Sequence, residues 1–145
     1  MRILFFIIVL FLSSLIPISS NAQLDSLLDA AQNATSDTAK LRNLVLVTEY
    51  CDIPDIEQYS NQCISLADSF MTLGLYNETD LQFYKSTAIN NLGFMYHVYS
   101  DYEQAISHYK ECIAIYEAID DSLGMSNGYN NISMVYKDAG ETEKA

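Results

Sequence analysis

The sequence predicts an all-α fold in which helical hairpins stack into a solenoid, and three observations lead to this prediction. Residues 88–105 return at residues 128–145, forty positions later, with the same Asn-Asn pair and the same final alanine. Apolar and polar residues alternate in both copies at the spacing of helix turns. Short runs rich in Gly, Asp and Ser separate the helical stretches. A fixed internal period is typical of solenoids, in which each unit buries its apolar face against the next.

Residues 1–22 have the pattern of a cleaved signal peptide. Arg2 precedes the apolar run 3–12, and Ser20 and Ala22 supply the small residues that a signal peptidase reads. The apolar run is shorter than the ~20 residues that a membrane-spanning helix needs. We therefore expect cleavage before Gln23 and export of residues 23–145 to the periplasm or another extracytoplasmic compartment. The alternative is an uncleaved anchor.

The formal net charge of −12 limits the possible partners. Such a surface repels phosphate backbones and anionic lipid, so we expect no nucleic acid partner. It is compatible with cationic ligands or basic protein surfaces, although acidic side chains also serve solubility alone. The three cysteines, Cys51, Cys63 and Cys112, form neither a metal motif nor an even disulfide set. We expect Cys63 and Cys112 to be compact buried residues of two helices.

The first predicted element is a short amphipathic helix at residues 24–34, followed by a degenerate helix pair at residues 39–73. The first helix of this pair ends before Pro54, because the residue before a proline disfavours the helical conformation. Asp55 is the expected N-cap of the second helix, and Gly74 closes it. The residues predicted inside the helix that begins at Ala39 are Leu41, Leu44, Val45, Val47 and Thr48.

Residues 77–119 form the next helix pair, with a turn at Ser100-Asp101, and residues 122–145 begin a truncated repeat. Gly124 and Gly128 each cost about 1 kcal/mol in a helix interior, so we expect the start of that last helix to fray. Solenoids normally end in a polar capping helix. Because this chain ends a few residues into a second helix, we expect a fragment of a longer protein or a truncated reading frame.

The repeated residues resemble the tetratricopeptide-repeat consensus. The positions that carry the resemblance are Ile89, Leu92, Gly93, Tyr96, Ala105 and Tyr109, and again Tyr129, Ile132, Ser133, Tyr136 and Ala145. Small residues at Gly93 and Ala105 would let the two backbones approach closely. Glu117 replaces the usual proline, Cys112 replaces a common alanine, and the period exceeds the usual spacing of about 34 residues. The resemblance implies a right-handed superhelix of helical hairpins, incomplete at its C-terminus.

Residues 25–50, with the opening sequence DSLL and with Asp37-Thr38 before the first helix of the degenerate pair, resemble the exported sensor regions of bacterial regulators. In those proteins, tetratricopeptide repeats precede a transmembrane helix and then a histidine kinase or a LuxR-type DNA-binding domain. The resemblance implies the extracytoplasmic input region of a membrane signalling protein, with its output domain beyond Ala145. The alternative is a free-standing periplasmic or secreted adaptor that assembles with a partner protein. Membrane attachment is expected only if a transmembrane helix follows.

The sequence contains no motif for catalysis or for a cofactor. His97 and His108 are its only histidines, and it has no HExxH motif, no glycine-rich phosphate loop and no GxSxG. We therefore expect no enzymatic activity, no cofactor and no metal.

The resemblance instead implies that the first helices of the repeats face a concave groove that holds an extended peptide. The expected groove residues are Asn90, Asn91, Phe94 and His97, and in the next repeat Asn130, Asn131, Met134 and Lys137. A row of asparagines can pair with a peptide main chain whatever its side chains. Alternatively, Asn91 and Asn131 hydrogen-bond to a neighbouring helix and fix the stacking angle. A carboxylate clamp is not expected, since such a clamp needs lysines and arginines and Lys137 is the only one in the set.

Overall fold

The computed structural model describes residues 20–74 and 76–141, which contain six helices and no strand. In chain order they are α2 (Ser20–Gln32), α3 (Asp37–Tyr50), α4 (Ile53–Leu73), α5 (Glu78–Val98), α6 (Tyr102–Ala118) and α7 (Ser122–Asp138). The prediction of an all-α fold is confirmed. Most of the predicted signal peptide and the residues 142–145 lie outside the described residues. None of the described helices is long and apolar enough to cross a membrane.

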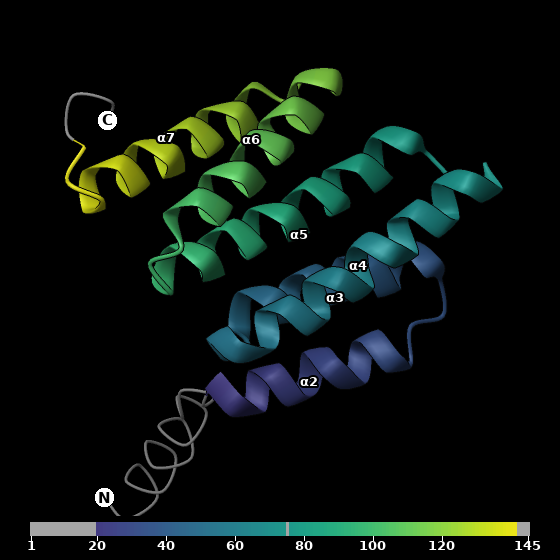
Figure 1. Ribbon diagram of the computed structural model, residues 1–145. Helices are drawn as coiled ribbons and strands as arrows, with labels where there is room; N and C mark the ends of the chain where they lie inside the picture. The colour runs from purple at the N-terminus through teal and green to yellow at the C-terminus, as the bar shows by residue number, and fades with distance from the viewer. Residues whose placement is uncertain (1–19, 75, 142–145) are drawn as a thin grey trace, which may run out of the picture.

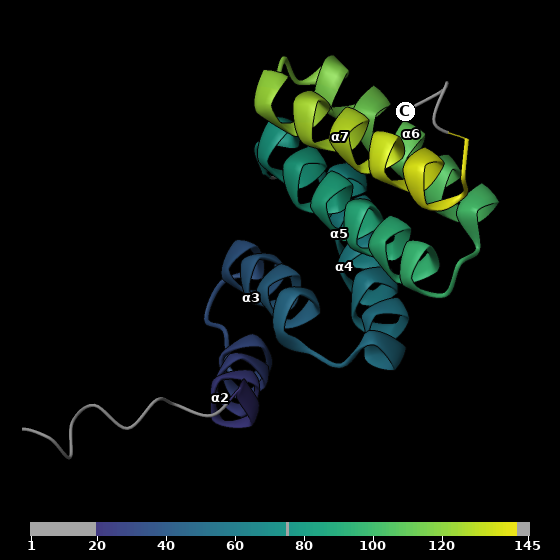
Figure 2. The same cartoon turned by 90° about the vertical axis from the view of Figure 1, so that its left-hand side faces the viewer.

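The helices stack in the order of the chain, each packed against the next (Figure 1). Helices α3–α4 and α5–α6 form two antiparallel pairs, and α7 begins a third. Helix α3 also contacts α5, and α5 contacts α7, whereas α4 makes no such contact with α6. Contacts between helices that are not neighbours in the chain therefore join the first helices of successive pairs. Figure 2 shows these helices, α3, α5 and α7, from the side.

Side-chain caps and left-handed residues set the helix ends. The side chain of Ser36 accepts a hydrogen bond from the first turn of α3, and Asn77, Asp101 and Asp121 do the same for α5, α6 and α7. Such caps satisfy backbone N–H groups that have no partner inside the helix. Within residues 20–74 and 76–141, the residues with positive φ lie in connections after a helix: Gly74, Ser100, Asp120 and Gly140.

Two predicted helix starts are wrong. Helix α2 begins at Ser20, four residues before the predicted start, so it crosses the predicted cleavage position. Helix α4 begins at Ile53 with Asp52 as its N-cap, so the predicted cap at Asp55 is wrong. Pro54 lies in the first turn of α4, where its missing N–H removes no helical hydrogen bond. The proline thus lies in the second helix of the pair and does not merely end the first.

The buried side chains form a continuous core along the stack. One cluster joins α2, α3, α4 and the start of α5, and a second joins α5, α6 and α7. Half-buried Ile64 of α4 packs against both clusters and against a third around Met95. All five residues predicted inside α3 are buried. Tyr109 is the largest fully buried side chain of the described residues.

The glycines of α7 hold the helix close to α6, and the expected fraying is not seen. Gly124 and Gly128 are buried, and α7 is regular from Ser122 onward. A Cβ at Gly124 would collide with the ring of Tyr116, and one at Gly128 would collide with Ile113. A larger residue at either position would therefore push α7 away from α6.

We predict that Gly128→Ala lowers the free energy of unfolding. Alanine gains up to about 1 kcal/mol of helix propensity, but overpacking against Ile113 costs about 1–3 kcal/mol. The control is Asn127→Ala, because Asn127 is the exposed neighbour, and its change should stay within about 0.5 kcal/mol. Urea unfolding followed by circular dichroism measures both. A Gly128→Ala protein more stable than the wild type would contradict the close approach.

Candidate functional site

Polar side-chain pairs join the first helices of successive repeats on one face of the stack. Asn91 of α5 donates from Nδ2 to Thr48 Oγ1 of α3 at 2.6 Å. Asn131 of α7 donates from Nδ2 to Asn90 Oδ1 of α5 at 2.9 Å. These bonds fix how far the first helices are turned and shifted against one another. The structure therefore gives Asn91 and Asn131 the interhelical bonds of the alternative interpretation.

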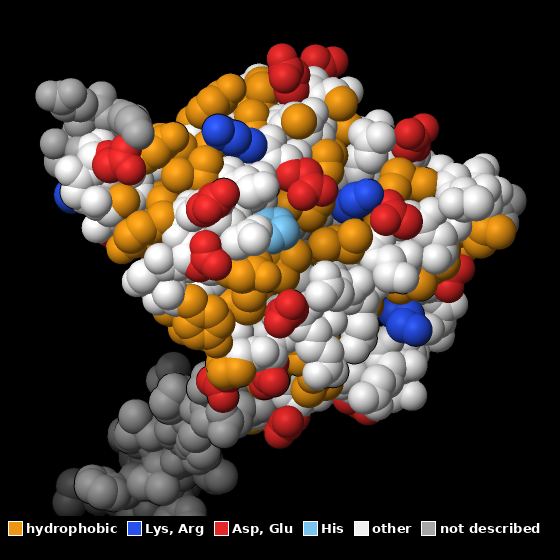
Figure 3. Space-filling view, viewed as in Figure 1, with side chains coloured by type: hydrophobic (Ala, Val, Ile, Leu, Met, Phe, Trp, Pro, Cys, Tyr) orange, Lys and Arg blue, Asp and Glu red, His pale blue; other side chains and the backbone are white. Residues whose placement is uncertain are grey.

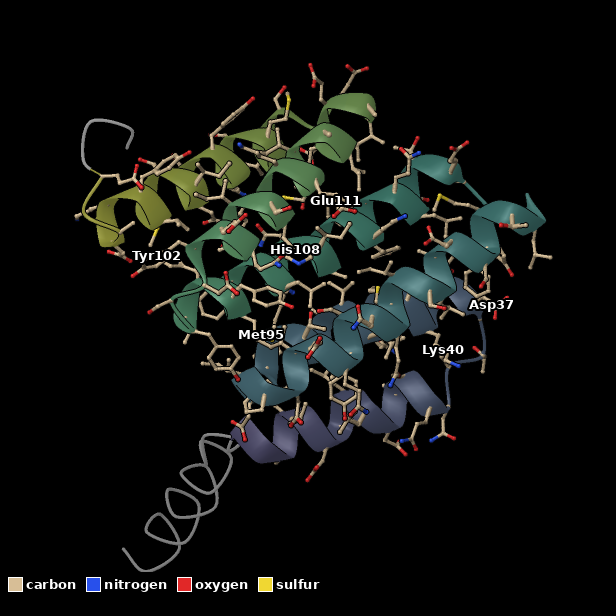
Figure 4. All side chains as sticks on the ribbon, in the orientation of Figure 1. Asp37, Lys40, Met95, Tyr102, His108 and Glu111 are labelled. Atoms are coloured by element: carbon tan, nitrogen blue, oxygen red, sulfur yellow. The ribbon has the colours of Figure 1, made fainter. Side chains whose placement is uncertain are left out.

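A third pair closes the same face at its far end. His97 Nε2 of α5 lies 2.8 Å from Asp138 Oδ2 of α7, and the two residues are 41 positions apart in the chain. The hydroxyl of Tyr102, at the start of α6 (Figure 4), lies 3.4 Å from the backbone carbonyl of Asp138. The ring of Tyr102 also meets that of His97 edge to face, with centroids 6.0 Å apart.

Next to this pair lies a hollow of about 370 Å³ between α5 and α7. Its lining comprises Phe94, His97, Val98, Ser100, Tyr102, Tyr109, Asn131, Met134 and Asp138. We call this set the α5–α7 hollow. Phe94 is 47% exposed and Met134 is 56% exposed, so apolar surface is available at the hollow. Buried Tyr109 connects the hollow to the core behind it.

Four of the eight predicted groove residues therefore line one hollow: Phe94, His97, Asn131 and Met134. Asn90 supports it through its bond to Asn131. Asn91 lies toward α3, and Asn130 and Lys137 are exposed and do not line the hollow. Sequence reasoning missed Asp138. Its position, about one repeat period after His97, is the signal that could have found it.

The α5–α7 hollow has negative character. Asp138 is its one acidic lining residue, its side chain is 53% exposed, and no lining residue is Lys or Arg. The residues contributed by α5 and α7 belong to the C-terminal halves of both helices. Helix C-termini carry a partial negative charge. A cationic group is therefore favoured there and an anionic group is not.

His108, the second histidine, does not line the α5–α7 hollow. The ring of His108 on α6 stacks on Tyr96, with centroids 5.3 Å apart. Its Nδ1 has no hydrogen-bond partner and lies 3.9 Å from Glu111 Oε2 (Figure 4). Figure 3 shows acidic side chains scattered over this face without forming a single patch. Among the described residues, no group of three or more His, Cys, Asp or Glu side chains is placed to hold a metal ion.

The three cysteines are free, and burial makes them poor nucleophiles. Burial raises the pKa of Cys63 and of Cys112 to about 12. Burial, with the nearby Asp55 carboxylate, raises the pKa of Cys51 to about 11. Because the thiolate is the reactive form, these thiols are unreactive near neutral pH. They act as packing residues.

Stacked helical hairpins with a polar and apolar face along their first helices define an all-α helical-repeat protein. A family model described as a tetratricopeptide repeat matches residues 84–145, which include most of α5 and all of α6 and α7. The all-α fold is consistent with a tetratricopeptide-repeat fold, and the match supports a tetratricopeptide-repeat protein. Comparisons with curated proteins and with solved structures found no match. Repeats of this family generally mediate protein–protein interactions.

We predict that Asn91→Ala lowers the free energy of unfolding by about 1 kcal/mol, because it removes the partly buried bond to Thr48. Asn130→Ala is the control, since Asn130 is exposed, and we expect a change within about 0.5 kcal/mol. Chemical unfolding of both variants measures the difference. Equal effects of the two substitutions would mean that the bond does not hold α5 against α3.

Proposed function

We propose that this protein is a non-catalytic scaffold that binds an extended segment of a partner protein or peptide along the face formed by α3, α5 and α7. The observation that carries the proposal is the α5–α7 hollow, where Phe94 and Met134 expose apolar surface beside polar groups. Concave apolar surface with a few polar groups is typical of binding sites. Single exposed apolar residues elsewhere on a protein need no such explanation.

In this proposal the polar residues divide into two groups. Asn91 and Asn131 hold the helices through Thr48 and Asn90, and each uses one of its two amide N–H donors to do so. Exposed Asn130 offers both a donor and an acceptor to the main chain of a bound segment. Contact with the partner therefore falls to the exposed side chains, and the interhelical pairs preserve the shape of the face.

We further propose that the scaffold is the extracytoplasmic input region of a membrane signalling protein. The support is the N-terminal pattern of Arg2, the apolar run 3–12 and the small residues Ser20 and Ala22, together with the resemblance of residues 25–50 to exported sensor regions. This role predicts that the coding sequence after Ala145 specifies a stretch of ~20 apolar residues and an output domain. Their absence there would favour the free-standing adaptor.

A photo-crosslinking residue placed at position 94 or 134 should become linked to the partner in the native cell. The control is position 73, because Leu73 at the end of α4 is 59% exposed, close to the 56% of Met134, but lies off the proposed face. Gel mobility and mass spectrometry identify the linked species. Equal crosslinking at position 73 would contradict binding along α3, α5 and α7.

Expression of the full chain in a bacterial host should yield an extracytoplasmic protein whose N-terminus is Gln23. Ala22→Asp should keep the leader attached, because a signal peptidase requires a small residue before the cleaved bond. Cell fractionation and N-terminal sequencing measure both results. Wild-type protein that stays in the cytoplasm and begins at Met1 would contradict the export proposal.

A further inference from the structure

We propose that the α5–α7 hollow selects a partner segment in which an apolar side chain is adjacent to a lysine or arginine. The apolar side chain enters the hollow beside Phe94 and Met134, and the basic side chain binds the carboxylate of Asp138. This inference rests on the proposed function and names the chemistry of its partner.

The apolar half of the proposal follows from the size and lining of the hollow. Its volume of about 370 Å³ is at the small end of the range of ligand pockets, which suits a single side chain of a bound segment. Phe94, Val98 and Met134 are each about half exposed, so an entering aliphatic or aromatic group removes apolar surface from water on both sides.

The basic half follows from how Asp138 is held. One carboxylate oxygen, Oδ2, lies 2.8 Å from His97 Nε2, which orients the group. The side chain is nevertheless 53% exposed, and a carboxylate can accept several hydrogen bonds. A lysine or arginine arriving from solvent can therefore form a charge-assisted hydrogen bond without displacing His97.

The surrounding charges favour the same partner. The C-terminal halves of α5 and α7 both line the hollow, and their partial negative charges add to that of Asp138. Lys137 is exposed and does not line the hollow, so it does not occupy the site of the incoming cation. The chain as a whole has a formal charge of −12, which attracts a basic segment and repels an acidic one.

The test is selection of a phage-displayed library of random dodecapeptides on the immobilised full chain. We expect the enriched peptides to share an apolar residue next to Lys or Arg. Synthetic copies of them should bind Asp138→Asn and Phe94→Ala at least tenfold more weakly in fluorescence polarisation. Met134→Lys is a second charge variant at an exposed position, and it should repel the same peptides. Circular dichroism verifies that each variant is folded.

Two matched controls separate the hollow from the rest of the face. Phe83→Ala removes an aromatic residue of α5 that is 45% exposed, close to the 47% of Phe94, but does not line the hollow. Glu117→Gln removes one negative charge at an exposed position of α6, as Asp138→Asn does at an exposed position of α7. Neither should change binding more than twofold.

The other outcomes overturn the inference in distinguishable ways. Enriched peptides without a basic residue, or with binding unaffected by Asp138→Asn and Met134→Lys, would contradict the inference and leave the scaffold proposal standing. Equal losses with Phe83→Ala and Phe94→Ala would place the peptide along the face but outside the hollow. No enrichment over the bare surface would count against both proposals.

Discussion

The rest of the structure depends on the close approach of α5 to α6. The ring of Tyr109 occupies the space that a Cβ of Gly93 would fill, because such an atom would lie 2.8 Å from the ring carbons. Sequence reasoning expected Gly93 to face Ala105, yet the nearest atoms belong to Tyr109. Gly124 and Gly128 repeat this arrangement one helix later, against Tyr116 and Ile113. The glycines of α5 and α7 thus leave room for large side chains of α6. The three helices pack as one unit around a shared core cluster.

This packing also places the hollow. Tyr109 fills the space beside Gly93 and at the same time lines the α5–α7 hollow, so the hollow lies directly over the core. The polar pairs of Asn131 with Asn90 and of His97 with Asp138 join the same two helices along this face. The apolar contacts fix the distance between the helices, and the polar pairs fix their register. A segment bound there meets a surface that is already formed, so little ordering is needed on binding.

The sequence predicts the fold well because the repeat period and the helical spacing are local properties. The five residues predicted inside α3 are all buried, and α7 begins at residue 122, where the truncated repeat was expected to begin. Two features that depend on a pair of helices were missed. Glycine at position 124 or 128 is unfavourable in an isolated helix, and its value appears only when α6 is packed against it. Asp138 was not assigned to the site, because its pairing with His97 of the preceding repeat shows in the sequence only through the repeat spacing.

The groups whose pKa values are raised by burial stay protonated near neutral pH. A catalytic nucleophile needs a lowered pKa or an adjacent base. Here burial raises the pKa of Cys63 and Cys112, which lie in the core. Burial, with the nearby Cys112, also raises the pKa of Tyr109 to about 12, so its phenol stays protonated where it lines the hollow. The hollow therefore offers apolar surface, a neutral phenol and one oriented carboxylate near the ends of two helices. These groups suit the basic segment proposed above, because the negative helix ends and the carboxylate both attract a cation.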